Sequence, residues 1–251
     1  MKNSKVLTIR RMSIIGILGA ISIVLGMTPL GFIPVGPTRA TIMHIPVIIG
    51  AIMEGPVVGG FVGLIFGLFS IFQAITNPTP VSVVFYNPLV SVLPRILIGI
   101  TSYYTYNALR KMGNKNTFVL VNMIWLAALS YLFYGIYQNV INSASFLMIA
   151  MNVILVIIVL VIAYFTFTRL KDKSLDIIIA TIVGTLTNTV GVLSLIYLLY
   201  AEKFVAGLGL DISAARSTIF GIGITNGIPE TIIAIIIVLS VVGALKLKER
   251  E

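Results

Sequence analysis

The sequence predicts an all-α integral membrane protein, because its composition and its apolar runs both point that way. Of its 251 residues, 58% are hydrophobic and only 10% are charged, whereas soluble domains carry roughly 25% charged residues. Several apolar runs reach the roughly 18 residues that cross a bilayer as a helix. The net charge of +9 would suggest a nucleic-acid partner if Lys and Arg formed one stripe. They fall instead in short clusters beside the apolar runs, which argues against nucleic acid.

Eight apolar segments are expected to cross the membrane as helices. They span about 12–30, 42–53, 56–75, 84–108, 117–134, 146–168, 174–200 and 219–245. The second is short, and residues 54–56 turn it tightly into the third. The first follows a basic stretch without a small-residue cleavage site, so we expect a retained span rather than a signal peptide. The chain has no cysteine, so we expect no disulfide framework and no thiolate metal site.

The basic residues predict that both termini are cytoplasmic. With eight spans and an internal N-terminus, four cytoplasmic regions hold most of the 17 Lys and Arg residues, as the positive-inside rule requires. These residues are Lys2, Lys5, Arg10 and Arg11 in the tail, Arg110, Lys111 and Lys115, Arg169, Lys171 and Lys173, and Lys246, Lys248 and Arg250. An odd number of spans would break the pattern.

Small residues recur at intervals of four in two of the segments. Gly16 and Ala20 lie in the first, and Gly59, Gly63 and Gly67 lie in the third. Such ridges let membrane helices approach closely, because lipid supplies no hydrophobic drive between helices. Two interpretations remain open for these ridges, namely packing within this protein and docking of a second membrane protein.

Two opposite charges are predicted at matching depth. Arg95 lies 11 residues from the outer end of its segment, and Glu230 lies 11 residues from the outer end of the last segment. At about 1.5 Å per residue, each is roughly 16 Å deep, near the bilayer midplane. An unpaired charge there is costly, so pairing is expected. The pair serves either as a buried ion pair that fixes helix register or as the floor of a ligand pocket, and the two roles are compatible.

Amide side chains and prolines are predicted close to the same depth. Asn226 lies one helical turn outward from Glu230, and Asn188 reaches a similar level within GTLTNTVGVL. Pro88, Pro94 and Pro229 each free a backbone carbonyl, which is tolerated only where protein or water satisfies it. The segment TNGIPE therefore faces a protein interior or a polar cavity.

The first outer loop, GFIPVGPTRATIMHIP, is rich in Pro and Gly and lies above this polar level. An acidic or hydroxylated solute entering from outside would meet Arg39, His44, Gln73, Asn77 and Asn87. For Arg39 alone, a solvated loop charge is the competing interpretation. The chain contains one His and no nucleophile-elbow, zinc-helix or Walker motif, so we expect neither an enzyme, nor a cofactor or metal site, nor ATP hydrolysis by this chain.

Four motifs in order resemble one family. The segments ATIMHIPVIIGAIMEGPVVGGFVGLIFGLFS (40–70), LPRILIG (93–99), GTLTNTVGVL (184–193) and TNGIPE (225–230) are similar to the substrate-binding S components of energy-coupling factor (ECF) transporters. Within the family, the first two motifs look most like pantothenate S components. The resemblance covers about 12–111 and 174–247.

The resemblance implies a single membrane domain over 1–251 that captures a vitamin from outside. It implies docking on a transmembrane coupling subunit with two cytoplasmic ATPases, and toppling within the membrane to release the vitamin. Gly16 and Ala20 would occupy the family's docking motif on the first helix. The family's pocket, carried onto this chain, selects Arg39, His44, Asn87, Arg95, Asn188, Asn226 and Glu230.

One departure from the family concerns the number of helices. The family has six, so we expect core helices 1–4 in 12–111, an inserted transmembrane pair in 112–173 and core helices 5–6 in 174–247. Inserting a pair preserves the topology of the helices that follow it. The uncharged linker 134–145 is either an outer turn or a lid, and the inserted pair is alternatively packed outside the core.

Pantothenate is the favoured substrate, because Arg39, Arg95 and His44 are candidate donors to a carboxylate. The alternatives are an S component for cobalamin or riboflavin, and a stand-alone proton-coupled carrier that uses Glu230 as its titrating group.

Overall fold

The computed structural model describes residues 7–28, 31–35, 38–141 and 175–248, together with the scattered positions 153, 156, 157, 159–161, 163 and 164. The chain divides into two compact units. The first unit comprises residues 1–107 and 177–251, and the second unit comprises residues 108–176. The expectation that 112–173 is a pair inserted into a six-helix core stays a prediction.

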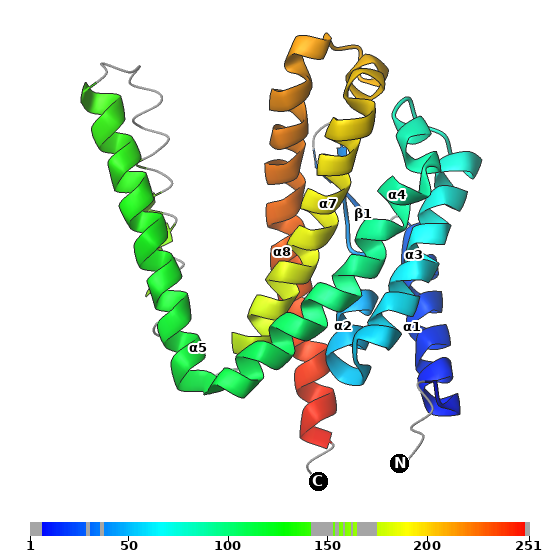
Figure 1. The fold of residues 1–251 in the computed structure, drawn as a ribbon. Coiled ribbons are helices and arrows are strands. Elements are labelled where there is room, and N and C mark those ends of the chain that lie inside the picture. Colours follow the sequence, from blue (N-terminus) through cyan, green and yellow to red (C-terminus); the bar gives the residue numbers. More distant parts are fainter. Residues whose placement is uncertain are drawn as a thin grey trace. The chain divides into compact units, whose positions relative to one another are not determined.

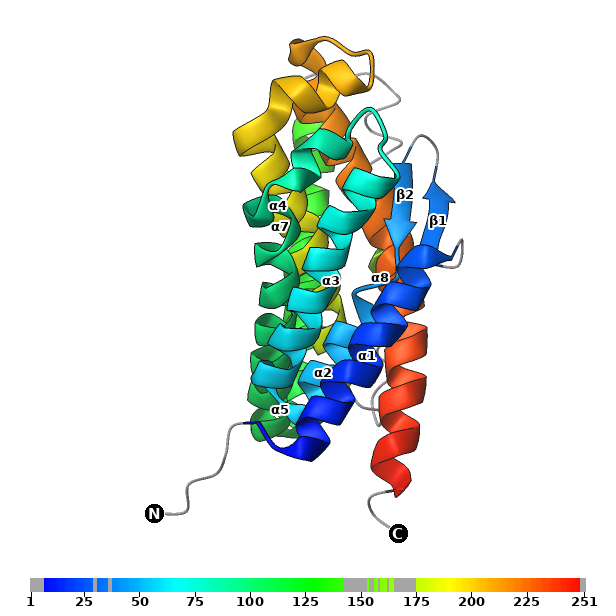
Figure 2. The same ribbon diagram turned by 90° about the vertical axis from the view of Figure 1, so that its right-hand side faces the viewer.

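The first unit is built from helices packed around one short central helix. Its helices are α1 (Ile9–Met27), α2 (Ile45–Glu54), α3 (Pro56–Thr76), the first part of α5 (Leu93–Ile141), α7 (Leu175–Gly207) and α8 (Ala215–Lys248). Residues 45–52 of α2 are all buried, and α1, α3 and α8 pack against this helix. The first residues of α1, the last residues of α8 and the α2–α3 turn lie at the same end of this unit (Figures 1 and 2).

Local signals explain where these helices begin. The Oγ1 of Thr8 accepts a hydrogen bond from the backbone N–H of Arg11 at 3.3 Å and caps α1. Pro46 and Pro56 occupy the first turns of α2 and α3, where a missing N–H costs no helical hydrogen bond. Gly55 between them has a φ of +103°, a conformation that favours glycine. The tight turn predicted at 54–56 is therefore confirmed.

The glycine ridge of α3 lets that helix touch the backbone of α5. A Cβ on Gly59 would lie 2.9 Å from the Cα of Gly99, and one on Gly67 would lie 2.7 Å from the Cα of Val92. A Cβ on Gly63 would meet the carbonyl oxygen of Arg95. Of the two interpretations of this ridge, packing within the protein is the one that the structure supports, and the contact fixes the backbone of Arg95.

Among the described residues, five helices are long and apolar enough to cross a membrane. Helix α2 has 10 residues, so it spans about 15 Å, roughly half of the hydrocarbon core. The segment 117–134 is helical within α5 beyond Gly113, where φ is +80°. Most of the segment 146–168 lies outside the described residues. Eight crossings and cytoplasmic termini stay predictions.

The fourth predicted span, 84–108, is wrong as one continuous helix. A 3₁₀ helix, η2 (Ser82–Tyr86), and the short α4 (Pro88–Ser91) precede α5, which begins at Leu93. Asn87 has an extended ψ of 121° and caps α4. Pro88 and Pro94 explain the division, because proline disfavours a helical conformation in the residue before it and starts a new helix readily.

Two further segments differ from expectation. The first outer loop contains an antiparallel hairpin of β1 (Phe32–Val35) and β2 (Thr38–Thr41), with Phe32 paired to Thr41. The hairpin adds strands to a fold expected to be all-helical, and β2 lies beside α8 (Figure 2). Residues 134–141, expected in a linker, continue helix α5, while 142–145 lie outside the described residues. Helix α7 kinks at Tyr200, and η3 (Ile212–Ala214) leads into α8.

Candidate functional site

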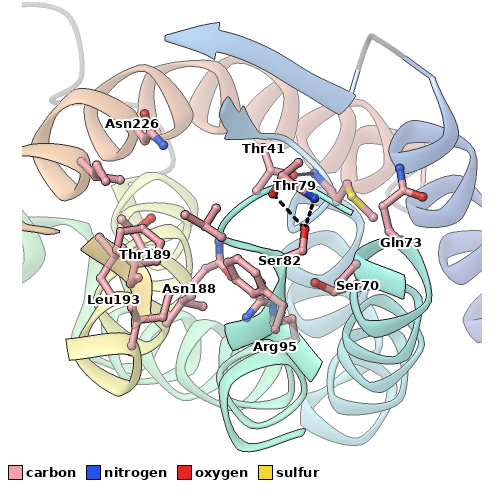
Figure 3. Close-up of a pocket in the computed structure, with 18 of the residues that line it drawn as sticks. Thr41, Ser70, Gln73, Thr79, Ser82, Arg95, Asn188, Thr189, Leu193 and Asn226 are labelled. Carbon is pink, nitrogen blue, oxygen red and sulfur yellow. Dashed lines mark hydrogen bonds between the residues drawn. The ribbon is translucent and has the colours of Figure 1, made fainter. Parts of the chain in front are cut away.

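A cavity of about 600 Å³ lies within the first unit, a size typical of small-molecule sites. Residues from β2, α3, η2, α5, α7 and α8 line it, and Figure 3 shows their side chains converging from these elements. The lining includes residues 79–82 and residues 207 and 208, and these segments lie at the opposite end of the unit from the first residues of α1 (Figure 1).

The lining divides into three chemical groups. Charged and amide side chains come from Arg95, Glu230, Gln73, Asn77, Asn188 and Asn226. Hydroxyl side chains come from Ser70, Thr79, Ser82 and Thr189. Apolar walls come from Phe85, Val192, Leu193, Ile196, Phe204 and Ile222. Such a lining suits a small molecule that combines an ionised group, hydroxyl or amide groups and an apolar body.

Arg95 is a buried cation at the start of α5. Its side chain is 5% exposed, its Nη1 donates to the backbone carbonyl of Val90 at 2.6 Å, and its guanidinium lies 5.3 Å from the centre of the Phe66 ring. The Nε atom is buried and has no hydrogen-bond partner in the described part of the chain. Arg95 is therefore anchored at one nitrogen and keeps further donor capacity in the cavity.

Glu230 is held by hydrogen bonds from two other elements. The backbone N–H of Thr41, at the end of β2, donates to Oε1 at 2.6 Å, and the Oγ1 of Thr189 on α7 donates to Oε2 at 2.9 Å. The carboxylate thus joins the first outer loop to α7 and α8. TNGIPE tolerates Asn226 and Glu230 because both line this cavity, while Thr225 bonds to the backbone of its own helix.

The direct ion pair expected between Arg95 and Glu230 is absent. Ion pairs do form elsewhere, between Glu54 and both Arg10 and Arg11. Arg95 and Glu230 do lie at one cavity, as matching depth suggested. Each is satisfied mainly by backbone or hydroxyl groups instead, because equal depth on two helices does not determine the distance across the cavity.

Asn188 and Asn226 also reach the cavity. Asn188 is 4% exposed and Asn226 is 7% exposed. The Oδ1 of Asn188 is buried and finds no partner among the described residues. Four of the seven predicted substrate-binding residues therefore line one cavity, and their role in binding stays a prediction.

The other three predicted residues are placed differently. His44 is fully buried below the lining, where its Nε2 lies 3.1 Å from the Oγ1 of Thr185. Asn87 caps α4 and donates from Nδ2 to the hydroxyl of Tyr200 at 3.0 Å. Neither is among the cavity-lining residues, so both contribute to packing here. Arg39 lies on β2 opposite Pro34, and its side chain lies outside what the structure describes.

Sequence reasoning missed several hydroxyl groups of the lining. Thr79 and Ser82 bond to one another, with 2.8 Å between Oγ1 and Oγ, and Ser70 projects from α3 (Figure 3). Ser70 continues the helical spacing of Gly63 and Gly67, so helical periodicity contained a usable signal for it. Thr41 contributes its backbone N–H, which no side-chain pattern reveals.

The predicted docking residues lie on an open face of α1. Gly16 and Ala20 are exposed, and a Cβ on Gly16 would meet no atom within 4 Å. Gly19 on the same helix is buried and faces Ile65 of α3. The surface at Gly16 is thus uncovered by the described part of the chain, and Ala20 is exposed one turn further along.

Comparison with known proteins adds a family and two relatives. The family model for the substrate-specific component of ECF transporters matches residues 10–143 and 124–242. The pantothenic acid transporter PanT of Lactococcus lactis subsp. cremoris is 37% identical over 84 residues, which is 28% of this chain and 43% of that protein. The pantothenate transporter PanT of Leuconostoc mesenteroides subsp. mesenteroides is 38% identical over 93 residues, or 37% of this chain and 44% of that protein.

These alignments span less than half the length of either relative. The family and the relatives are described as transporters rather than enzymes, and the apolar helices agree with a multi-pass membrane protein. The family model, by contrast, extends over most of the chain, and the resemblance noted in the four sequence motifs is confirmed. The chain belongs to the family of substrate-specific S components of ECF transporters.

Proposed function

We propose that this protein captures pantothenate from outside the cell membrane and delivers it through an ECF coupling subunit and two cytoplasmic ATPases. The main support for pantothenate as the substrate is that both relatives are named as pantothenate transporters. The cavity supports it chemically. Pantothenate combines a carboxylate, an amide, hydroxyl groups and a geminal dimethyl group, and the lining offers Arg95, amide and hydroxyl side chains, and apolar walls.

The proposed orientation places the cavity toward the outside. The first residues of α1 and the last of α8 lie at one end of the first unit, and the segments that supply lining residues 79–82, 207 and 208 lie at the other end. The basic clusters flank α1 and α8 in the sequence, and positively charged flanks favour the cytoplasm. A solute from outside would then reach Arg95, Asn188, Asn226 and Glu230 from the η2 end.

The proposed docking face is the exposed side of α1 around Gly16 and Ala20. A small-residue surface lets a partner helix approach to backbone contact within lipid. Gly16 meets no neighbouring atom within 4 Å, so a partner would find that surface uncovered by the described residues. The coupling subunit is the partner that we assign to it.

Uptake by whole cells tests the proposal. Cells that express this protein with an ECF module should accumulate labelled pantothenate, and cells whose module carries inactive ATPases should not. The same cells are tested with labelled riboflavin and cobalamin. Uptake of another vitamin instead would contradict the assignment of pantothenate as the substrate. Pantothenate uptake that persists without active ATPases, and that a proton uncoupler abolishes, would favour the stand-alone carrier that uses Glu230.

A further inference from the structure

The longest charge-free stretch of the chain belongs to the second unit. Residues 116–168 contain no Asp, Glu, Lys or Arg, and Lys115 directly precedes them. Helix α5 bends at Gly113 and then runs to Ile141 without another non-helical residue (Figure 1). The Oγ1 of Thr117 donates to the backbone carbonyl of Leu109 at 3.2 Å and so supports the bend. The part of α5 beyond this bond is called the 117–141 helix below.

The 117–141 helix presents a broad apolar surface outward. Among its described side chains, ten large apolar or aromatic ones are between 38% and 76% exposed. Met123 and Leu126 are 63% and 65% exposed, whereas Thr117 and Val121 are buried. The exposed positions fall on neighbouring stripes of the helix, because many are three or four residues apart. An apolar surface of this kind marks a contact with a membrane or with another protein.

The size and the spread of these side chains favour lipid as the covering. A partner helix packs in a membrane against small residues that let two backbones approach. Met123, Leu126 and Phe133 are large and hold a partner backbone away. Lipid acyl chains are fluid, so they can cover a broad and uneven apolar surface without matching its shape.

Both ends of this surface carry side chains that prefer the membrane–water interface. Lys115 is exposed at one end, and a basic side chain near a helix end extends its charge toward the headgroups. At the other end, Tyr131, Tyr134 and Tyr137 are 76%, 59% and 60% exposed, while residues 116–130 contain no tyrosine. Tyrosine is enriched at the headgroup level, where its ring contacts apolar chains and its hydroxyl contacts water.

The distance between the two ends matches the thickness of a bilayer. Tyr131 and Tyr137 follow Lys115 by 16 and 22 residues. A helix therefore places them roughly 24 and 33 Å from Lys115 along its axis. The hydrocarbon core of a bilayer is about 30 Å thick, so the tyrosines and the lysine can reach opposite headgroup layers at the same time.

We propose that Tyr131, Tyr134 and Tyr137 form an aromatic girdle that seats the 117–141 helix in one headgroup layer of the bilayer. Lys115 lies in the opposite layer, and acyl chains cover the exposed side between them. The partner of this surface is the phospholipid bilayer. The girdle sets how deeply the helix sits, because the apolar run would otherwise continue to residue 141. This inference does not depend on which vitamin the cavity binds.

Spin labels can measure the depth of the helix directly. The chain contains no cysteine, so Met123→Cys and Ser130→Cys each provide one labelling position in the full chain. Each labelled protein is placed in vesicles of phosphatidylethanolamine and phosphatidylglycerol. Access of oxygen, which concentrates among acyl chains, is compared with access of a water-soluble nickel chelate. The label at Met123 should lie roughly 2 Å from the bilayer centre and the label at Ser130 roughly 8 Å from it, given a centre midway between Lys115 and Tyr134.

Removing the girdle should move the two labels in opposite directions. The variant Tyr131→Leu/Tyr134→Leu/Tyr137→Leu extends the apolar run to residue 141, which moves its midpoint by about four residues, or roughly 6 Å. The label at Met123 should then lie about 6 Å further from the bilayer centre, and the label at Ser130 about 6 Å closer to it. Opposite shifts report sliding of an intact helix, because unfolding would raise nickel access at both positions.

The matched control removes exposed tyrosines from the first unit. Tyr104 and Tyr197 are 60% and 45% exposed, and Tyr104→Leu/Tyr197→Leu should leave both label depths unchanged. If the girdle variant fails to fold, Phe at the same three positions keeps the rings and removes the hydroxyl groups. That variant should give smaller shifts in the same opposite directions.

Three results would overturn the proposal. Nickel access at Met123 equal to that of a label in water would mean that water covers the surface. Exclusion of oxygen together with dipolar coupling between labels on different chains would mean that a second copy covers it. Unchanged depths in the variants with Leu or Phe at the three girdle positions would mean that the tyrosines do not seat the helix.

Discussion

The small-residue ridges of α3 and α1 share a spacing but differ in their surroundings. On α3, a Cβ added to Gly59 or Gly63 would strike the backbone of α5, and one added to Gly67 would strike the backbone of Ser91 and Val92 just before α5. On α1, a Cβ added to Gly16 would meet nothing within 4 Å. The α3 ridge packs against the segment that carries Arg95, whereas the α1 ridge is exposed at Gly16. Spacing alone therefore shows that helices can approach, but not which helices do so.

The largest expected effect comes from filling the α3 ridge. Gly63→Leu would drive a side chain into the backbone carbonyl of Arg95. Because a helix backbone cannot move aside as a side chain can, we expect the free energy of unfolding to fall by more than the roughly 1–3 kcal/mol of ordinary overpacking. Yield and thermal unfolding in detergent measure it, and pantothenate binding should be lost with the fold. A stable Gly63→Leu protein would refute the packing role of this ridge.

The next effect comes from filling the open face of α1. Gly16→Leu should leave the melting temperature and pantothenate affinity unchanged, since no described atom lies near the site. Transport by cells with an active ECF module should nevertheless be abolished, because the partner helix is kept away. Binding and uptake are measured on the same variant. Unimpaired transport, or equal loss of binding and transport, would remove the docking assignment.

Gly19→Ala provides a smaller effect on the same helix. The added Cβ would lie 2.6 Å from the Cδ1 of Ile65, the flexible end of a side chain that can rotate aside. We expect a destabilisation of about 1 kcal/mol, read as a lowered melting temperature, with transport retained. A loss of transport without a loss of stability would instead place Gly19 in the docking face, and Gly16 and Gly19 would then no longer have different roles.

The smallest effect concerns the attachment of the N-terminal end of α1. Glu54→Gln removes ion pairs with Arg10 at 3.0 Å and Arg11 at 3.7 Å. The Arg10 side chain is 74% exposed, so screening by solvent limits the change in unfolding free energy to below about 1 kcal/mol. Thermal unfolding at low and high salt checks this. A large, salt-insensitive loss would mean that this contact, rather than Gly19 and α3, positions the open face.

Most helix positions, and the common level of the polar residues along the helices, could be predicted from sequence, since both follow from apolar length and residue count. Arg95, Asn188, Asn226 and Glu230 reach one cavity for that reason. The partners of Glu230 could not be predicted, because one is a backbone N–H that the β1–β2 hairpin brings to it. His44 and Asn87 illustrate the same limit. Each stands at the N-cap position of a helix, α2 or α4, and its side chain bonds to Thr185 or Tyr200 rather than lining the cavity.

Binding by the isolated protein tests the central claim most directly. The full chain, purified in detergent without ATP or partner subunits, is equilibrated with labelled pantothenate, riboflavin and cobalamin in turn. We predict saturable binding of pantothenate at about one molecule per chain, as one cavity lined by Arg95, Asn188 and Glu230 requires, and none of the other two vitamins. Absence of pantothenate binding, or saturable binding of another vitamin, would contradict the account.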